Sequence, residues 1–170
     1  LPSTEWKKNT FKKPEQQKWY EGETISLGIG QGYNSFTILQ LAHAMANLVN
    51  NGIVMKPHLV KAIEDPFTRK RTLTTPKESY RINLNPENIE VIKKAMVEVN
   101  KSGTSATVFK GTSYTVGGKT GTSQVFSLNS KEYNHSTTAE FLRDHALYVA
   151  FAPAEKPTTV IAMVVENAGF

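Results

Sequence analysis

One segment of the sequence combines residue types that could bind a carboxylate and stabilise a developing negative charge. Residues 117–123 read Gly-Gly-Lys-Thr-Gly-Thr-Ser, between flanks that are largely apolar or β-branched. Because side chains alternate along a strand, Thr120 and Thr122 would share one face, with the Lys119 ammonium beside them. At a sheet edge, an extended peptide could pair with this strand while backbone N–H groups face an oxyanion. These groups suit acyl transfer on a peptide that ends in a free carboxylate.

The glycines of the same segment also need an explanation, because glycine weakens a strand interior. Gly117, Gly118 and Gly121 predict that another group approaches the backbone closely. The alternative interpretation is an ordinary Lys-Thr-Gly tripeptide near a turn, without a function.

Composition and motifs exclude several classes of protein. The 170 residues are 39% hydrophobic and 21% charged, which is typical of one globular domain, and no apolar run is long enough to span a bilayer. The absence of cysteine excludes disulfides, a thiolate nucleophile and cysteine-ligated metals. The four histidines are scattered, so we expect neither a metal nor another cofactor. The glycines of residues 28–32 lack the spacing of a dinucleotide fingerprint and predict a turn ahead of a helix.

The first 22 residues are polar and basic, with a net charge of +5 for the whole chain. They predict an extended segment on the surface of a domain formed by residues 23–170. We interpret the lysines as a solvated surface; the alternative is attraction to anionic lipid headgroups or to an anionic polymer. No nucleic-acid-binding motif accompanies them, so we expect no nucleic-acid partner.

The remaining pattern predicts an α+β fold with an antiparallel sheet flanked by helices. Apolar spacing indicates a helix over 38–49 and a second helix capped by Asn85 and ended by Gly103. A capping box predicts a short helix over 137–143. Strands are expected at 53–63, where Pro57 indicates a sheet edge, around Lys119, and at 145–152 and 158–166, the last two forming a hairpin. Residues 64–84 are charged and rich in turns.

Several segments together resemble the class B penicillin-binding proteins, and among them the penicillin-binding protein 2 subfamily of Gram-negative bacteria. The Lys-Thr-Gly strand is one of the motifs shared by penicillin-binding proteins and serine β-lactamases. The segments that carry the resemblance are residues 22–32, the helix after them, 118–124, 142–145, 150–153 and 164–169. The resemblance implies the C-terminal portion of the penicillin-recognising transpeptidase fold, a five-stranded sheet flanked by helices.

The resemblance also implies an activity, D,D-transpeptidation of peptidoglycan stem peptides through a serine acyl-enzyme that β-lactams block. It implies that Lys119 and Thr120 help to bind the substrate carboxylate and tune the catalytic site, and that Gly121 belongs to the same substrate-binding strand. Thr122 would add a hydroxyl contact and a backbone N–H to the oxyanion hole. The implied partners are the D-Ala-D-Ala stem peptide, β-lactam antibiotics and a membrane glycosyltransferase of the elongation machinery. The implied location is the periplasm, with an anchor in the inner membrane.

The sequence departs from the family pattern in one respect, because none of its serines is followed by lysine three residues later. Ser127-Leu128-Asn129 matches a second family motif but follows Lys119 instead of preceding it, so we interpret it as coincidence. We therefore expect the nucleophile, its lysine and the middle motif to lie in an upstream part of the same protein, and the 170 residues to be inactive alone. The alternatives are a serine β-lactamase, a β-lactam sensor or a non-catalytic scaffold.

Overall fold

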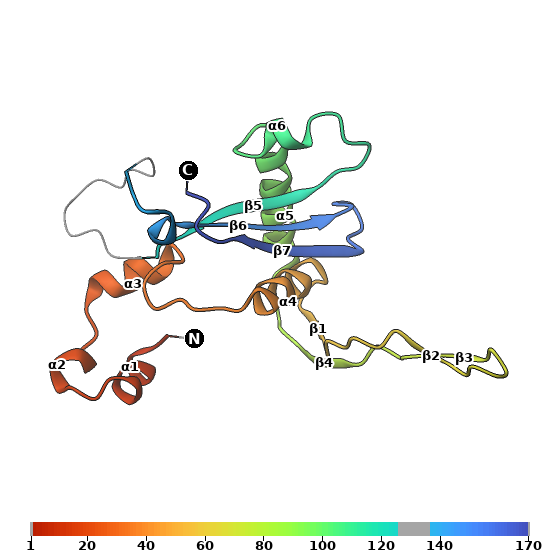
Figure 1. Cartoon of the computed structure of the whole chain (residues 1–170), viewed down its shortest axis with the longest axis horizontal. Helices are drawn as coiled ribbons and strands as arrows, with labels where there is room; N and C mark the ends of the chain where they lie inside the picture. Colours follow the sequence, from red (N-terminus) through yellow and green to blue (C-terminus); the bar gives the residue numbers. More distant parts are fainter. Residues whose placement is uncertain (1, 126–136, 170) are drawn as a thin grey trace. The chain divides into compact units, whose positions relative to one another are not determined.

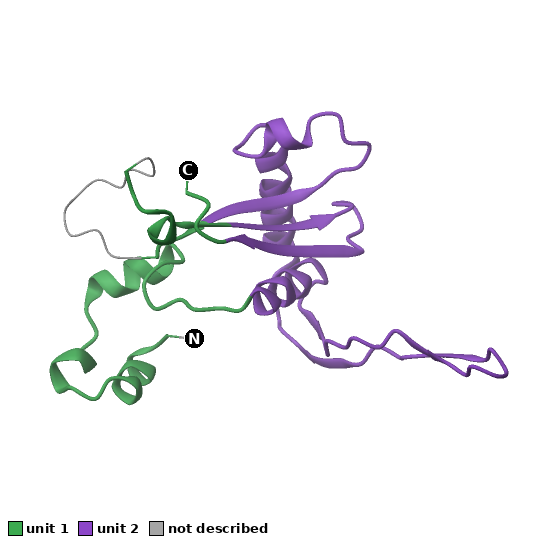
Figure 2. Cartoon of the chain, viewed as in Figure 1, with its two compact units in different colours: residues 1–37, 122–146, 166–170 green, residues 38–121, 147–165 purple. Residues whose placement is uncertain are grey.

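The computed structural model describes residues 2–125 and 137–169 and has the predicted α+β character (Figure 1). The chain divides into two compact units (Figure 2). Unit 1 comprises residues 1–37, 122–146 and 166–170, and unit 2 comprises 38–121 and 147–165. Ser127 to Asn129 lie outside the described residues.

A three-stranded sheet carries the segment with the candidate chemistry. Its strands are β5 (Gly117–Ser123), β6 (His145–Ala152) and β7 (Thr159–Val165), in the spatial order β5-β6-β7. Figure 1 shows neighbouring strands running in opposite directions. The strands predicted around Lys119 and at both C-terminal apolar runs are therefore confirmed, as is the hairpin between the last two.

Two helices of unit 2 match the predictions closely. Helix α4 (Ile38–Val49) packs against β7, and α5 (Pro86–Lys101) contacts α4 and the short α6 (Ala106–Phe109). The Asn85 side chain accepts hydrogen bonds from the N–H of Glu87 (2.8 Å) and of Asn88 (3.4 Å), as expected of an N-cap. Pro86 occupies the first turn, where a missing N–H costs nothing.

The apolar core of unit 2 forms where these helices meet the sheet. Its buried apolar side chains are Val54, Ile89, Met96, Val116, Ala150 and Phe151. Phe151 is only 1% exposed, which makes it the largest fully buried side chain among the described residues. Ile92 of α5 is exposed, although its spacing from Ile89 and Met96 would place it on the same face of the helix.

The single strand expected over 53–63 is wrong. Residues 53–81 form two short antiparallel pairs that extend as an arm (Figure 1). The four strands are β1 (Ile53–Met55), paired with β4 (Glu78–Arg81), and β2 (Ala62–Glu64), paired with β3 (Arg71–Leu73). Pro57 lies between the pairs, where it has no N–H to donate to a continuing ladder.

The N-terminal segment contains helices rather than extended chain. Helix α1 (Thr4–Thr10) is capped by Ser3, whose side chain accepts from the Trp6 N–H at 3.0 Å. Helix α2 (Pro14–Gln17) begins with proline in its first turn, and α3 (Glu21–Gly28) follows. The sequence did not predict them because helices of one or two turns show little apolar periodicity. The domain division after residue 22 stays a prediction.

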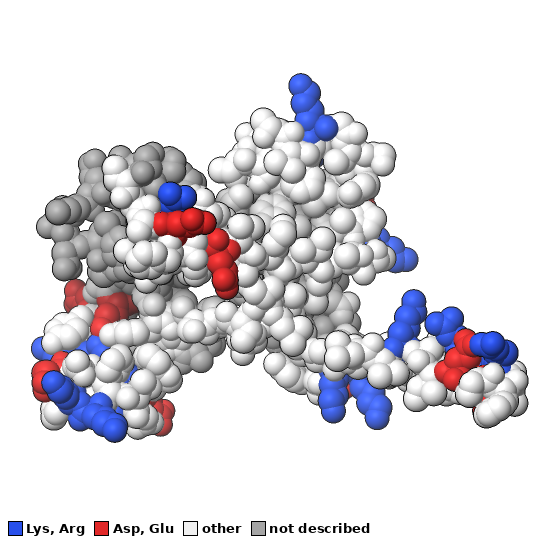
Figure 3. Space-filling model, in the orientation of Figure 1, with Lys and Arg blue, Asp and Glu red and all other residues white. Residues whose placement is uncertain are grey.

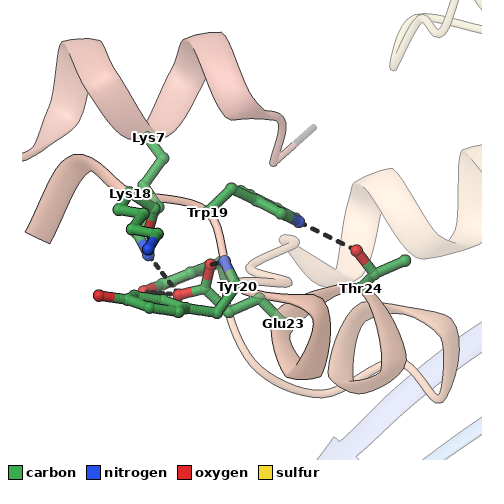
Figure 4. A network of polar contacts seen from close by, with 7 residues as sticks. Lys7, Lys18, Trp19, Tyr20, Glu23 and Thr24 are labelled. Carbon is green, nitrogen blue, oxygen red and sulfur yellow. Dashed lines mark hydrogen bonds and ion pairs between the residues drawn. The ribbon is translucent and has the colours of Figure 1, made fainter.

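The lysine-rich start is also not uniformly solvated, because Lys7 is buried at 2% exposure. Its ammonium forms an ion pair with Glu23 and donates to the carbonyl of Lys18 at 2.6 Å (Figure 4). The rings of Trp19, Tyr20 and Tyr33 lie 5.3–6.0 Å from it, within cation–π range. Lys7 therefore connects α1 to α3 within unit 1.

The predicted capping box at 137–140 is wrong in detail. The helix there is a single 3₁₀ turn, η1 (Glu140–Leu142), whose N-cap is Ala139 and lacks a side-chain cap. The start of β6 is held instead by the C-terminal turn. The Asn167 N–H donates to His145 Nδ1 at 2.9 Å, and the Gly169 N–H donates to the Asp144 carbonyl at 3.1 Å.

Candidate active site

Strand β5 lies at an edge of its sheet in the part of the chain that the structure describes. The order β5-β6-β7 pairs it with β6 on one side only. An edge strand presents backbone N–H and C=O groups to which an extended peptide can pair. Among the described residues, one side of β5 therefore has no neighbouring strand.

The four candidate residues alternate along β5 as predicted. Thr120 and Thr122 are half-buried, whereas Lys119 and Gly121 are exposed. The Lys119 ammonium donates to the backbone carbonyl of Thr120 at 2.8 Å. The strand therefore holds the Lys119 ammonium against its own backbone at an exposed position.

The hydroxyl of Thr120 is held by the loop between α5 and α6. Its Oγ1 lies 3.3 Å from the Oγ1 of Thr104, and either hydroxyl can be the donor. When Thr104 donates, the Thr120 hydroxyl keeps its own proton for a bound carboxylate. No sequence pattern pointed to Thr104, because sixteen residues separate the two threonines.

The groups that approach Gly117 and Gly118 are aromatic side chains of β6, whereas Gly121 faces Leu147 of the same strand. A Cβ on Gly117 would lie 2.2 Å from the Phe151 ring, and one on Gly118 would lie 2.1 Å from the Tyr148 hydroxyl. The predicted close approach is thus confirmed at both positions. Its cause is internal packing, so these two glycines are not by themselves evidence of a ligand.

A buried polar chain fixes β5 and β6 against helix α5. The Tyr148 hydroxyl donates to Asn100 Oδ1 at 2.7 Å, and Asn100 Nδ2 donates to the Val116 carbonyl at 2.9 Å. Asn100 is 5% exposed, so both bonds form away from water, where an unpaired amide would be costly. These residues position the start of the candidate strand.

A largely apolar cavity of about 480 Å³ opens beside Thr120. Val116 and Tyr148 line it from the sheet, and Phe109 lines it from α6. Aromatic and aliphatic walls suit an apolar group rather than a carboxylate. The sequence did not predict this cavity, because its walls come from several elements.

One protein family matches nearly the whole of the chain. The profile of the penicillin binding protein transpeptidase domain matches residues 6–169. The chain belongs to this transpeptidase family. The resemblance inferred from the sequence is confirmed, including the likeness to penicillin-binding protein 2.

Relatives within the transpeptidase family agree with this assignment. The Peptidoglycan D,D-transpeptidase MrdA of Haemophilus influenzae is 41% identical over 99% of this chain and 26% of its own length. The crystal structure of Pseudomonas aeruginosa PBP2 in complex with WCK 5153 is 36% identical, with a TM-score of 0.73 over 99% of this chain and 33% of that one. The imipenem acyl-enzyme complex of penicillin-binding protein A from M. tuberculosis has a TM-score of 0.63 at 29% identity, over 85% of this chain and 29% of that one.

The chain therefore spans about a quarter of the length of the curated relative that it matches. No helix among residues 2–125 and 137–169 combines the length and apolar character that crossing a membrane requires.

Proposed function

We propose that the protein is a peptidoglycan D,D-transpeptidase that cross-links stem peptides through a serine acyl-enzyme. The observation that carries the proposal is the position of Lys119 to Thr122 on a sheet edge. The family membership and the relatives' names support the same activity.

The reaction has two acyl-transfer steps. A serine Oγ attacks the carbonyl of the penultimate D-alanine, the peptide bond breaks, and terminal D-alanine leaves with the proton. The amine of a neighbouring stem peptide then attacks the ester carbonyl, and the serine regains its proton as the ester breaks. We propose that the nucleophile comes from another part of the whole protein, because no serine here has lysine three residues later.

In this scheme β5 forms the wall that holds the donor peptide. Lys119 and the hydroxyls of Thr120 and Thr122 bind its terminal carboxylate, since a charge-assisted hydrogen bond is about twice as strong as a neutral one. Gly121 contributes backbone groups to the same wall. The Thr122 N–H donates to the oxyanion of the tetrahedral intermediate.

The same proposal extends to partners and location. β-Lactams acylate the serine in place of the donor peptide, just as imipenem forms an acyl-enzyme complex with penicillin-binding protein A from M. tuberculosis. We place the whole protein in the periplasm, anchored to the inner membrane outside this chain, beside a glycosyltransferase in cell elongation and rod-shape maintenance.

The rate of acylation by a labelled penicillin tests the proposal in the whole protein. We expect a one-to-one covalent adduct. Lys119→Ala should slow its formation about ten- to a hundredfold, the value of a charged hydrogen bond of roughly 1.5–3 kcal/mol. Lys110→Ala, which removes an exposed lysine outside β5, is the control. Equal rates for Lys119→Ala and the control would refute the role of β5.

Deacylation separates the alternatives. A transpeptidase stays acylated by penicillin and releases D-alanine from a stem peptide, whereas a serine β-lactamase turns penicillin over. A sensor stays acylated without acting on stem peptide, and a scaffold forms no adduct. Rapid loss of the label, or the absence of D-alanine release, would overturn the proposed activity.

A further inference from the structure

The turn at residues 28–32 holds one side chain in a fixed place within unit 1. Gly30 (φ 81°) and Gly32 (φ 68°) both adopt left-handed backbone conformations on either side of Gln31. The Gln31 N–H donates to the carbonyl of Ser26 at 2.9 Å. The Gln31 carbonyl accepts from the Asn34 side chain at 3.0 Å. The backbone of Gln31 is thus fixed in a geometry that non-glycine neighbours would strain.

The Gln31 side chain reaches the candidate strand. Its Nε2 donates to the backbone carbonyl of Thr122 at 2.9 Å, across a separation of 91 residues. The side chain is half-buried, so water competes only partly for this bond. The contact lies inside unit 1, which contains both residues.

The turn is anchored to the Lys7 network. Tyr33, two residues after Gln31, donates its hydroxyl to Glu23 at 3.0 Å, and Glu23 is paired with Lys7. The ring of Tyr33 also packs against Trp6 and Phe11. The N-terminal helices therefore support the turn from which Gln31 extends.

From this geometry we propose that Gln31 is a positioning residue for Thr122. Its amide holds the carbonyl of Thr122. Because the N–H and C=O of one residue point to the same side of an extended strand, this bond also restrains the direction of the Thr122 N–H. In this proposal Gln31 acts through Thr122 and not by a contact of its own with the substrate. The inference rests on the proposed function, in which the Thr122 N–H stabilises the oxyanion.

This role predicts a specific kinetic signature. A correctly aimed oxyanion donor stabilises the tetrahedral state more than the bound ground state. Misdirecting it should lower the acylation rate constant and leave the dissociation constant of the non-covalent complex nearly unchanged. A general loss of folded protein would instead lower the labelled fraction without changing that rate constant.

The experiment compares two variants of the whole protein, each of which replaces a hydrogen-bond-donating glutamine by methionine, a side chain of similar size. Gln31→Met removes the hydrogen bond to Thr122. Gln17→Met removes a similar bond, from Gln17 Nε2 to the Phe11 carbonyl at 2.7 Å, in the same unit but away from β5. We expect Gln31→Met to lower the acylation rate constant about three- to tenfold, the value of one hydrogen bond. Gln17→Met should leave it within twofold.

A second variant keeps the test decisive if Gln31→Met does not fold. Gln31→Glu presents a carboxylate to the Thr122 carbonyl at neutral pH, but a donating hydroxyl once protonated. Its acylation rate relative to wild type should therefore recover as the pH falls through the pKa of the introduced carboxyl, which the Thr122 carbonyl raises above the ordinary value of glutamic acid. Gln17→Glu should show no such recovery.

The outcomes separate this inference from the proposed function. If the unaltered protein forms no adduct with labelled penicillin, the proposed function fails. If it does form one, three results would overturn the positioning role. The first is an acylation rate constant of Gln31→Met equal to that of wild type, and the second is an equal loss of rate in Gln17→Met. The third is a ratio of the Gln31→Glu rate to the wild-type rate that does not change with pH.

Discussion

At the residue scale, Gly118 shows how tightly the candidate strand packs against its neighbour. A methyl group there would lie 2.1 Å from the Tyr148 hydroxyl and 3.1 Å from Asn100 Nδ2. Both atoms belong to the buried chain that ends at the Val116 carbonyl. A side chain at residue 118 would therefore displace the groups whose hydrogen bonds hold β5 in place.

Gly118→Ala is expected to lower stability by about 1–3 kcal/mol, the usual cost of overpacking. The matched control is Gly22→Ala in α3, where nothing lies within 4 Å of the added methyl group. That change should be neutral or slightly stabilising, because alanine is the better helix former. Thermal unfolding of both variants checks the prediction, and equal midpoints would contradict it.

The pair of Lys7 and Glu23 gives unit 1 a pH-dependent stability. Hydrogen bonds from Lys7 and from the Tyr20 N–H lower the pKa of Glu23. Burial acts to lower the pKa of Lys7, but hydrogen bonds to Glu23 and Tyr33 outweigh it, so that this pKa is raised. The contribution of the Lys7 ammonium to stability is complete below the ordinary pKa of lysine, and it is lost as the pH rises through the raised pKa of Lys7.

For Glu23 the sign is opposite, because its stabilising form is the carboxylate. Its contribution is complete above its ordinary pKa of 4.5 and is lost as the pH falls through the lowered value. Glu23→Gln should therefore be less stable than wild type at pH 7, with the gap closing in acid. Glu21→Gln, at an exposed position of the same helix, is the control. Thermal midpoints between pH 2 and 7 measure the gap, and a gap independent of pH would refute the assignment.

At the element scale, helix α5 links its own cap to the candidate strand. Asn85 caps its first turn, and Asn100 near its last turn binds Tyr148 and the Val116 carbonyl. Asn100 therefore joins α5 to β5, and Asn85 stabilises the start of the same helix.

Asn85→Ala is expected to cost about 1 kcal/mol, the typical value of an N-cap. Asn88→Ala, which makes the same change three residues along but leaves the capping side chain in place, should cost less. Chemical denaturation of the two variants measures the difference. A smaller loss for Asn85→Ala than for Asn88→Ala would contradict the cap.

Elements with a strong local signal could be predicted from the sequence. The caps and apolar spacing indicated α4 and α5, and the β-branched runs indicated β6 and β7. The arm was missed because β2, β3 and β4 are short, bury little and are defined by pairing, although Val54 of β1 is buried. The N-terminal helices were missed because each is only one or two turns long.

The candidate site was predictable only in part, for a related reason. Lys119, Thr120 and Thr122 are consecutive or alternate on one strand, so their relation can be read from the chain. Thr104, Asn100 and Gln31 reach that strand from distant positions in the sequence. Burial of Lys7 likewise depends on Glu23 and the surrounding aromatic rings, which a charge pattern does not reveal.

At the scale of the whole molecule, charged side chains of both signs occur together over the N-terminal helices and along the arm on the face drawn in Figure 3. The candidate chemistry instead depends on local groups at β5.

Because the proposed function places the nucleophile outside these 170 residues, the isolated chain and the whole protein should behave differently towards penicillin. The isolated 170 residues should form no covalent adduct with labelled penicillin, because none of their serines has the lysine that activates it. The whole protein should form one at the same concentration. Mass spectrometry of both samples checks this. A stoichiometric adduct on the isolated chain would show that the nucleophile lies within it.

The most direct test of the central claim is a crystal structure of the whole protein acylated by a β-lactam. We predict that the carboxylate of the bound molecule lies within hydrogen-bond distance of the Thr120 or Thr122 hydroxyl, and its acyl oxygen within reach of the Thr122 N–H. Its amide side chain should run along the open edge of β5. An acyl group bound away from Lys119 to Thr122 would contradict the proposed role of this strand.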